Sequence, residues 1–285
     1  MSKRSYNLAK PLVATAALTR GYALEASHNY RFIIRRNRSL LRAFRVNSRR
    51  VKSDHFLFHE GNVSVLARMA IRVASWPLRL KFVNVGVFFE KFKLETNPEN
   101  IKKCPETELS LRFSLGYRAM CAFWTNEFLT YLDEYDIIFR IDEDCVLNSL
   151  NYETVLSPMI EGAVDYCAGM TFGHDDPGVT RGFEDFVFEW HQEHPGTKSP
   201  VLNLNPYTNL FLVRTKAVSS NPDALAFLQH VRSSGCVLNN RWGDAVVWGA
   251  LLSMYGNTIK TNLTAEVSYF HGSHGTQVSE GQQTP

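Results

Sequence analysis

YDIIFRIDEDCVL, residues 135–147, joins a short apolar run to three consecutive acids, Asp142, Glu143 and Asp144. The apolar residues, interrupted only by Arg140, predict a buried β-strand. If Arg140 is buried there, it must pair with a carboxylate. Carboxylates at the end of such a strand repel one another and need a positive partner. Asp142 and Asp144 could hold a divalent cation, because side chains two residues apart point to the same side of an extended backbone. A turn with solvated acids is the alternative.

Other apolar runs alternate along the chain with stretches of helical periodicity. The strand candidates are 12–18, 55–60, 80–89, 136–141, 165–170 and 209–214, and the helix candidates are 62–74, 115–131, 222–233 and 244–254. This alternation predicts an α/β fold with a mixed, mostly parallel sheet flanked by helices. Ligands of such folds bind beyond the carboxyl ends of the strands, which is where the acids lie. We expect one domain over residues 1–275 and a loose polar tail over 276–285.

The composition is that of a globular protein with a full core: 285 residues, 45% hydrophobic and 21% charged,. The net charge of +3 gives no sign of a nucleic-acid partner,. Residues 31–52 are rich in Arg and Lys, lack acids, and interleave apolar residues at roughly helical spacing. They predict a basic amphipathic helix. Its polar face is either simply solvated or in peripheral contact with anionic lipid headgroups or a phosphorylated substrate.

The five cysteines are scattered and form no CxxC pair, which excludes a zinc ribbon,. We expect reduced, half-buried thiols in an intracellular protein, with one disulfide as the alternative.

Four motifs, taken in order, resemble the fungal α-1,2-mannosyltransferase family, nucleotide-sugar enzymes with the GT-A fold. The family's Tyr-Arg-x-Met-Cys-x-Phe segment is matched at 117–123, and its Arg-Val-Glu-Pro-Asp motif corresponds to RIDED at 140–144. Its Arg-Trp-Gly-Asp-Ala motif is matched in full at 241–245, and its Tyr-Tyr/Phe-His motif at 269–271. The agreement spans roughly residues 110–275. It implies a GT-A fold and a hexosyltransferase that retains the configuration of the transferred sugar.

The resemblance also implies a metal site. Asp144 would bind the metal directly, Asp142 would contact the metal or the donor, and His271 would supply a further ligand. The metal would neutralise the charge that develops on the leaving diphosphate of a nucleotide sugar. Mixed carboxylate and imidazole ligands favour Mn²⁺, with Mg²⁺ as the alternative.

Further residues receive roles from the same resemblance. Asp244 would orient the donor sugar or accept a proton from the acceptor hydroxyl, although a helix N-cap needs no such function. Trp242 would offer a platform for a sugar face, with core packing as an equal alternative. Thr19 and Arg20 follow the first strand, where GT-A folds seat the nucleotide base. Arg118 would either reach a donor phosphate or pair internally.

One position departs from the family. The family has a glutamate, proposed as a nucleophile, in a Ser-Asn-Phe-Glu stretch, and this chain has Phe211 at that place. Without a carboxylate there, we expect either retention by a front-face route or inversion with Asp244 as the base. Tyr207, Thr208 and Asn209 remain as polar candidates for the sugar site.

We therefore expect a metal-dependent glycosyltransferase that moves a sugar to a glycan or lipid-linked glycan acceptor. The resemblance favours mannose from a GDP-sugar, with a UDP-sugar as the alternative. A phosphohydrolase with a second metal at residues 174–176 and an inactive glycan-binding relative are the competing hypotheses. We expect a cytoplasmic location, with peripheral membrane contact through residues 31–52, or the Golgi lumen if an anchor has been removed.

Overall fold

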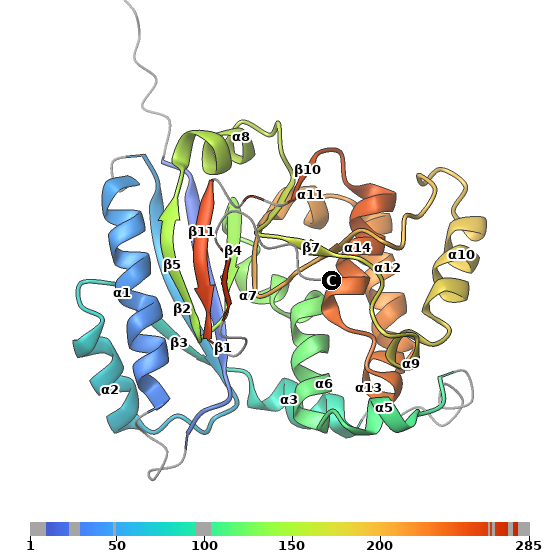
Figure 1. Cartoon of the computed structure of the whole chain (residues 1–285), viewed down its shortest axis with the longest axis horizontal. Coiled ribbons are helices and arrows are strands. Elements are labelled where there is room, and N and C mark those ends of the chain that lie inside the picture. Colours follow the sequence, from blue (N-terminus) through green and yellow to red (C-terminus); the bar gives the residue numbers. More distant parts are fainter. Residues whose placement is uncertain are drawn as a thin grey trace, which may run out of the picture.

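The computed structural model of the chain describes residues 10–22, 29–47, 50–94, 104–261, 263, 266–272 and 276–278. Its centre is a seven-stranded sheet of order β10-β6-β9-β4-β1-β2-β3 (Figure 1). The strands are β1 (Leu12–Thr19), β2 (Lys52–His59), β3 (Leu80–Asn84), β4 (Ile137–Ile141), β6 (Tyr166–Ala168), β9 (Leu210–Arg214) and β10 (Ile259–Lys260). All neighbouring pairs are parallel except those of β9, which is antiparallel to β4 and β6. The expected mixed, mostly parallel sheet is confirmed.

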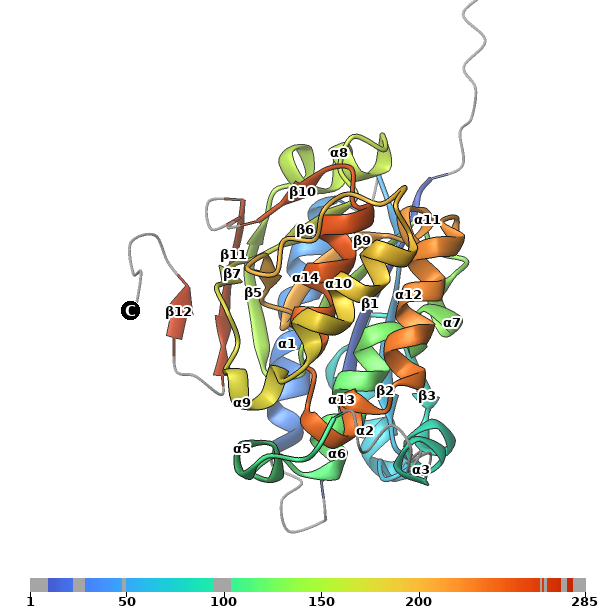
Figure 2. The same ribbon diagram turned by 90° about the vertical axis from the view of Figure 1, so that its right-hand side faces the viewer.

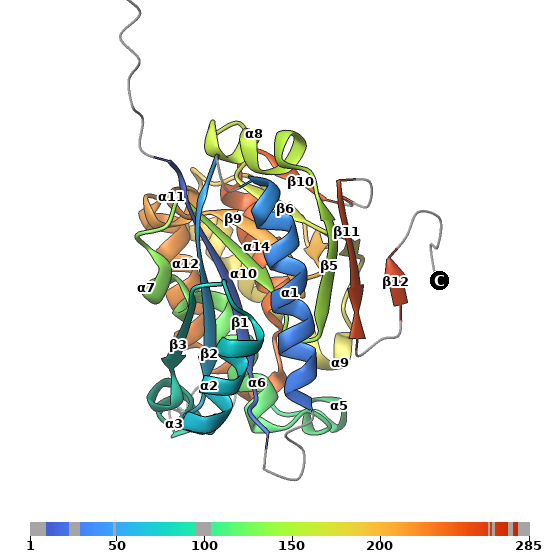
Figure 3. The same cartoon turned by 90° about the vertical axis from the view of Figure 1, so that its left-hand side faces the viewer.

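Helices cover both faces of this sheet. One face carries α1 (Tyr30–Asn47) and α2 (Val65–Ala74), which lie toward the viewer in Figure 3. The other carries the longer helices α3 (Gly86–Leu94), α6 (Leu115–Ala122), α10 (Phe183–Glu193), α12 (Pro222–Ser233) and α14 (Asp244–Tyr255), several of which face the viewer in Figure 2. The short helices are α5 (Glu108–Leu111), α7 (Leu129–Leu132), α8 (Ser157–Ile160), α9 (Pro177–Thr180), α11 (Thr215–Ser219) and α13 (Cys236–Asn240), with π-helical η2 (Phe123–Glu127) and η3 (Tyr152–Leu156).

Burial on both faces explains why the strands have continuous apolar sequences. In β4, Ile138 packs into the core on the α6 and α14 side, whereas Ile137 and Phe139 pack into the core beneath α1. Arg140 shares the side of Ile138, because side chains alternate along a strand. A cation is therefore directed into an apolar layer, where only carboxylates or aromatic faces can stabilise it.

In a second, smaller sheet, a strand from late in the sequence lies beside the strand that follows the acids. This sheet has the order β12-β11-β5, with β5 (Cys145–Leu150), β11 (Val267–His271) and β12 (Thr276–Val278). A two-stranded pair, β7 (Thr171–Phe172) and β8 (Asn205–Pro206), completes the strands of the described residues. Residues 276–278, expected in the loose tail, instead add β12 to the free edge of β11. The rest of that tail, 279–285, lies outside the described residues.

Most expected elements differ from the structure by a few residues at their ends, and two differ in kind or in continuity. The apolar run 80–89 was expected as one strand, but β3 ends at Asn84 and α3 begins at Gly86. A continuous apolar run does not distinguish strand from helix, and Phe88, Phe89 and Phe92 pack as a helical face against the core,. The helix expected over 115–131 is divided into α6, η2 and α7.

One pair of cysteines differs from the expectation of reduced thiols. Cys104 and Cys236 form a disulfide, so the alternative of one disulfide holds. Cys121, Cys145 and Cys167 are free and buried.

The expected basic helix is present as α1 up to Asn47; residues 48–49 lie outside the described residues, and Lys52 begins β2. Within the described residues, no helix combines the length and apolar character that crossing a membrane requires.

Candidate active site

A cavity of about 470 Å³ opens at the carboxyl ends of β1 and β4, where α/β folds bind ligands,. It brings together seven of the predicted site residues: Arg20, Asp142, Asp144, Tyr207, Asn209, Asp244 and His271. Its other lining residues are Leu18, Glu60, Ser114, Gly116, Tyr117, Met120, Trp124, Arg140, Glu143 and Thr208. Three predicted site residues, Thr19, Arg118 and Trp242, do not line it.

The acids form a tight turn rather than an extension of β4. The Asp142 N–H donates to the Asn209 carbonyl at 3.0 Å, and the Cys145 N–H donates back to the Asp142 carbonyl at 3.1 Å. The expectation that Asp142 and Asp144 share one side of an extended backbone is therefore wrong. The turn instead directs its three acids to three different partners, while keeping all of them at the cavity.

Asp142 is directed to Arg140, which also holds Asp244. Arg140 Nε donates to Asp142 Oδ1 at 2.9 Å, and its Nη1 donates to Asp244 Oδ2. The guanidinium is 3% exposed and lies 4.4 Å from the Trp124 ring centroid and 5.9 Å from that of Phe211. Burial alone would lower the pKa of Arg140, but the two carboxylates outweigh it and raise that pKa above its ordinary value. The expectation that a buried Arg140 must pair with carboxylates is confirmed.

Burial raises the pKa of Asp142 above its ordinary value, and Arg140 opposes this effect. The negative charge of Asp144 contributes in the same direction as burial. Asp142 thus lines the cavity and pairs with the same cation that holds Asp244.

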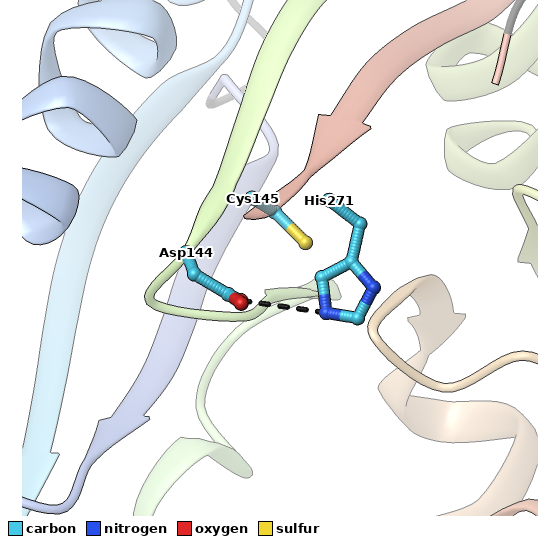
Figure 4. Close-up of side chains that lie close together, drawn as sticks. All are labelled: Asp144, Cys145 and His271. Atoms are coloured by element: carbon cyan, nitrogen blue, oxygen red, sulfur yellow. Dashed lines mark ion pairs between the residues drawn. The ribbon is translucent and has the colours of Figure 1, made fainter. Parts of the chain in front are cut away.

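Asp144 is directed to His271, whose Nε2 lies 3.4 Å from Asp144 Oδ1 (Figure 4). Cys145 is the third member of this group, and the three potential ligand atoms lie within 4.8 Å of one another. Burial raises the pKa of the Cys145 thiol well above its ordinary value, and its Sγ donates to the Asn209 carbonyl at 3.7 Å. A carboxylate oxygen and an imidazole nitrogen suit Mn²⁺. Asp144 and His271 therefore fit a divalent cation that takes its remaining ligands from phosphate and water.

Glu143 is directed away from that pair. It accepts a hydrogen bond from the Tyr22 hydroxyl at 2.9 Å and lies 3.6 Å from Arg20 Nε. Thr19 is fully buried, and its hydroxyl accepts a hydrogen bond from the Gly21 N–H at 3.2 Å. The structure thus gives Thr19 a role in shaping this loop, whereas the exposed Arg20 stands at the rim of the cavity.

The Arg-Trp-Gly-Asp segment forms the turn that precedes α14. Arg241 has a left-handed backbone, φ 60°, which costs a non-glycine residue free energy and needs support,. Its guanidinium lies 2.8 Å from Asp175 Oδ2 and 4.4 Å from the Phe113 ring centroid. Gly243 is the N-cap, so Asp244 is the first helical residue and not the cap.

Trp242 is a core residue in this structure. It is 1% exposed and makes edge contacts with Phe183 and Phe186. Its indole N–H donates to the Arg181 carbonyl at 3.1 Å. Trp242 therefore packs in the core, which was the alternative to its expected role as a platform for a sugar face.

Arg118 likewise has an internal role. It is 3% exposed, and its Nε donates to the Phe113 carbonyl at 3.1 Å. Nη1 donates to Glu106 at 2.8 Å and to the Leu238 carbonyl at 2.7 Å, and Nη2 donates to the Ser110 carbonyl at 2.9 Å. Of the two expected roles, the structure shows the internal pairing, because the guanidinium lies outside the cavity.

Asn209 and Tyr207 approach the cavity from the segment before β9. Asn209 Oδ1 accepts a hydrogen bond from the Tyr269 hydroxyl at 3.1 Å. Its Nδ2 is buried and has no hydrogen-bond partner within the described part of the chain, which leaves a donor for a ligand. The Tyr207 ring lies 5.9 Å from that of His271. Burial raises the pKa of Tyr207 to about 12, so its hydroxyl stays protonated.

Sequence reasoning missed how α1 supports this site. Arg36 is completely buried, and its Nε donates to the Ile141 carbonyl at 2.9 Å. Ser39 accepts a hydrogen bond from the Leu147 N–H at 2.9 Å. These two hydrogen bonds hold the backbone just before and just after the acidic turn. The available signal was a set of polar residues, including Arg36 and Ser39, on the helix face that also carries Ile33 and Leu40.

A mostly parallel sheet with an acidic turn at its carboxyl edge, and a histidine returned to that turn, defines the class: the chain has a glycosyltransferase fold of the GT-A type. No family model and no curated protein matches the sequence. Among solved structures, the chain is similar to core-mannan synthase A (CmsA/Ktr4) from Aspergillus fumigatus in its Mn/GDP form. The TM-score is 0.75 at 15% identity, covering 94% of this chain and 76% of that chain.

It is also similar to the mannosyltransferase Ktr4p from S. cerevisiae, with a TM-score of 0.70 at 16% identity, covering 92% of this chain and 70% of that chain. The same yeast protein in complex with GDP gives a TM-score of 0.68 at 15% identity, covering 92% and 71% of the two chains. The resemblance that the motifs implied is confirmed at the level of the fold.

Proposed function

We propose that this protein is a metal-dependent glycosyltransferase that transfers a hexose from a nucleoside diphosphate sugar. The observation that carries the proposal is the Asp144–His271 pair in the same cavity as an Asp244 carboxylate fixed by Arg140. Two of the similar structures hold GDP, one of them with Mn, which supports a nucleotide and metal at this place. When bound, the divalent cation would neutralise charge on the leaving diphosphate.

The donor that we propose is GDP-mannose, because the fold similarity is to mannosyltransferases. A UDP-sugar is the alternative, since no residue described here reads the base. Arg20, exposed at the rim, is a cation suited to a donor phosphate,. Asn209 Nδ2 supplies a donor for a sugar hydroxyl, because its other amide atom is already engaged by Tyr269.

The acceptor that we propose is a glycan or a lipid-linked glycan. Asp244 faces the cavity with one oxygen held by Arg140, which keeps the carboxylate oriented. In that position it would orient the donor sugar or accept the proton of the acceptor hydroxyl.

Phe211 supports a route without a covalent intermediate at its position. Its ring is completely buried and stacks on Tyr166 with centroids 5.4 Å apart. No carboxylate therefore stands where the resembled family has its proposed nucleophile. We propose retention by a front-face route, and NMR of the product's anomeric proton distinguishes it from inversion with Asp244 as base.

The competing phosphohydrolase hypothesis needs a second metal. The acids proposed as ligands of that metal make other contacts in the structure. Asp175 pairs with Arg241 at 2.8 Å, and Asp176 caps α9 by accepting from the Gly178 N–H at 2.8 Å. Among the described residues, the group of Asp144, Cys145 and His271 is the one suited to a metal ion.

Activity and binding assays test the proposal together. Wild-type protein with Mn²⁺ should release GDP from GDP-mannose faster when an acceptor such as a mannoside is added. Calorimetry with GDP and UDP then identifies the preferred base. Tight binding of free glycan with no binding of either nucleotide would instead support the inactive glycan-binding relative.

A further inference from the structure

The outer face of α1 is a row of arginines. Arg31, Arg35, Arg38, Arg42 and Arg45 are all exposed, and their spacing of four and three residues places them on one side of the helix,. The surrounding sequence has little charge to balance them. Residues 29–89 contain 11 Arg and 2 Lys but only two acids, Asp54 and Glu60.

The neighbouring helix α2 exposes apolar side chains where a surface helix ordinarily carries polar ones. Val65 is 61% exposed, Leu66 79%, Met69 56% and Val73 78%, and Trp76, just beyond the helix, is 78% exposed. An apolar face of this kind marks a surface that contacts another partner.

The two helices lie side by side (Figure 3), and their exposed side chains are hereafter called the α1–α2 surface. Arg38 Nε donates to the Ala74 carbonyl at 3.3 Å, and Asn37 Nδ2 donates to Ser75 Oγ at 3.0 Å. A cavity of about 580 Å³ adjoins the C-terminal part of α1 and the segment that follows α2, with Arg45 and Trp76 among its lining residues. A helix with exposed arginines and a helix with exposed apolar side chains are therefore neighbours.

We propose that the α1–α2 surface docks on an anionic lipid membrane. Charge complementarity selects this occupant: the arginines match lipid phosphates and carboxylates, while the apolar side chains of α2 and the Trp76 indole suit the boundary between headgroups and acyl chains. This membrane contact does not depend on the proposed function.

Vesicle flotation tests the docking without any donor or acceptor. The full chain is mixed with vesicles of phosphatidylcholine, alone or with 30% phosphatidylserine. The charge variant is Arg31→Gln/Arg35→Gln/Arg42→Gln, and the apolar variant is Leu66→Ser/Val73→Ser. Matched controls are Arg112→Gln/Arg181→Gln/Lys216→Gln and Val201→Ser/Leu225→Ser, which change exposed residues outside this surface. Nucleotide binding, measured separately, reports on the fold and on the proposed function.

We expect wild-type protein and both controls to float with the anionic vesicles only. At about 1 kcal/mol per arginine, the charge variant should bind roughly 100-fold more weakly, and the apolar variant should also be lost from the vesicles. No flotation of the wild type, or unchanged flotation of either variant, would overturn the proposal. So would self-association of the wild type, measured by sedimentation, that the same variants abolish, because the surface would then bind a second copy of the chain.

Discussion

The imidazole of His271 lies 3.4 Å from the carboxylate of Asp144, although the two residues belong to distant parts of the chain. The antiparallel pairing of β11 with β5 sets this geometry, because it places His271 opposite Cys145. The Gly272 N–H also donates to the Asp144 carbonyl at 3.1 Å. Strand β11 thus supplies the second ligand, beside the acidic turn, of a candidate two-ligand metal site.

The substitution His271→Asn should weaken Mn²⁺ binding by at least about tenfold, because loss of a ligand costs more than loss of its supporting hydrogen bonds. Calorimetric titration of Mn²⁺ in the presence of GDP measures the effect. His191→Asn is the matched control, since its ring contacts Thr197 and lies outside the cavity. Equal Mn²⁺ affinity in His271→Asn and wild type would remove this residue from the metal site.

Replacing Arg140 should destabilise the fold and disturb the site at once. Arg140→Gln leaves Asp142 and Asp244 without their cation, and breaking a buried ion pair of this kind costs about 3 kcal/mol or more,. Arg140→Lys keeps the charge and should lose less. Urea denaturation gives both free energies of unfolding; a Gln variant as stable as wild type would show that the bridge does not hold Asp244.

The stability of the protein should fall as the pH is lowered below about 6.5. Burial, reinforced by Arg36, lowers the pKa of His55 to about 3, and its Nδ1 lies 2.6 Å from Thr15 Oγ1. Above pH 6.5 this histidine is neutral in both states and contributes no pH dependence. Below pH 6.5, the unfolded chain binds a proton at this histidine that the folded chain does not. At pH 5 the free energy of unfolding is therefore about 2 kcal/mol lower.

Thermal unfolding of wild type and His55→Gln between pH 7.5 and pH 5 measures this contribution. The variant should be less stable at pH 7.5 but should lose less stability on acidification. Parallel curves for the two proteins would assign the pH dependence to other groups.

The disulfide between Cys104 and Cys236 should contribute about 2–5 kcal/mol, because it joins segments 132 residues apart,. The double variant Cys104→Ser/Cys236→Ser should therefore unfold at lower denaturant concentration. Peptide mapping without reductant should recover the two cysteines in one linked peptide, while the three buried thiols stay free. Alkylation of all five cysteines in unreduced, denatured protein would contradict the bond.

Local sequence patterns predicted the strands of the central sheet other than β10, and the need for a partner at Arg140, because both depend on burial within a short segment. They did not reveal that Asp244 is this partner, since the contact joins β4 to the start of α14. Nor did they separate residues that shape the site from residues that face it. Arg118 and Trp242 belong to matched motifs, yet both hold neighbouring backbone in place. Arg36 was hidden among the exposed arginines of α1, because only packing shows which of them is buried.

The central claim is that Asp144 binds a metal that carries the donor's diphosphate, and calorimetric titration of GDP tests it most directly. GDP is titrated into wild type, Asp144→Asn and the exposed control Asp223→Asn. Each titration is done once with Mn²⁺ present and once with EDTA present. We predict that GDP binds wild type and the control only with Mn²⁺, and that Asp144→Asn weakens this binding by at least about tenfold. GDP binding that is equally tight in EDTA, or unchanged in Asp144→Asn, would contradict the account.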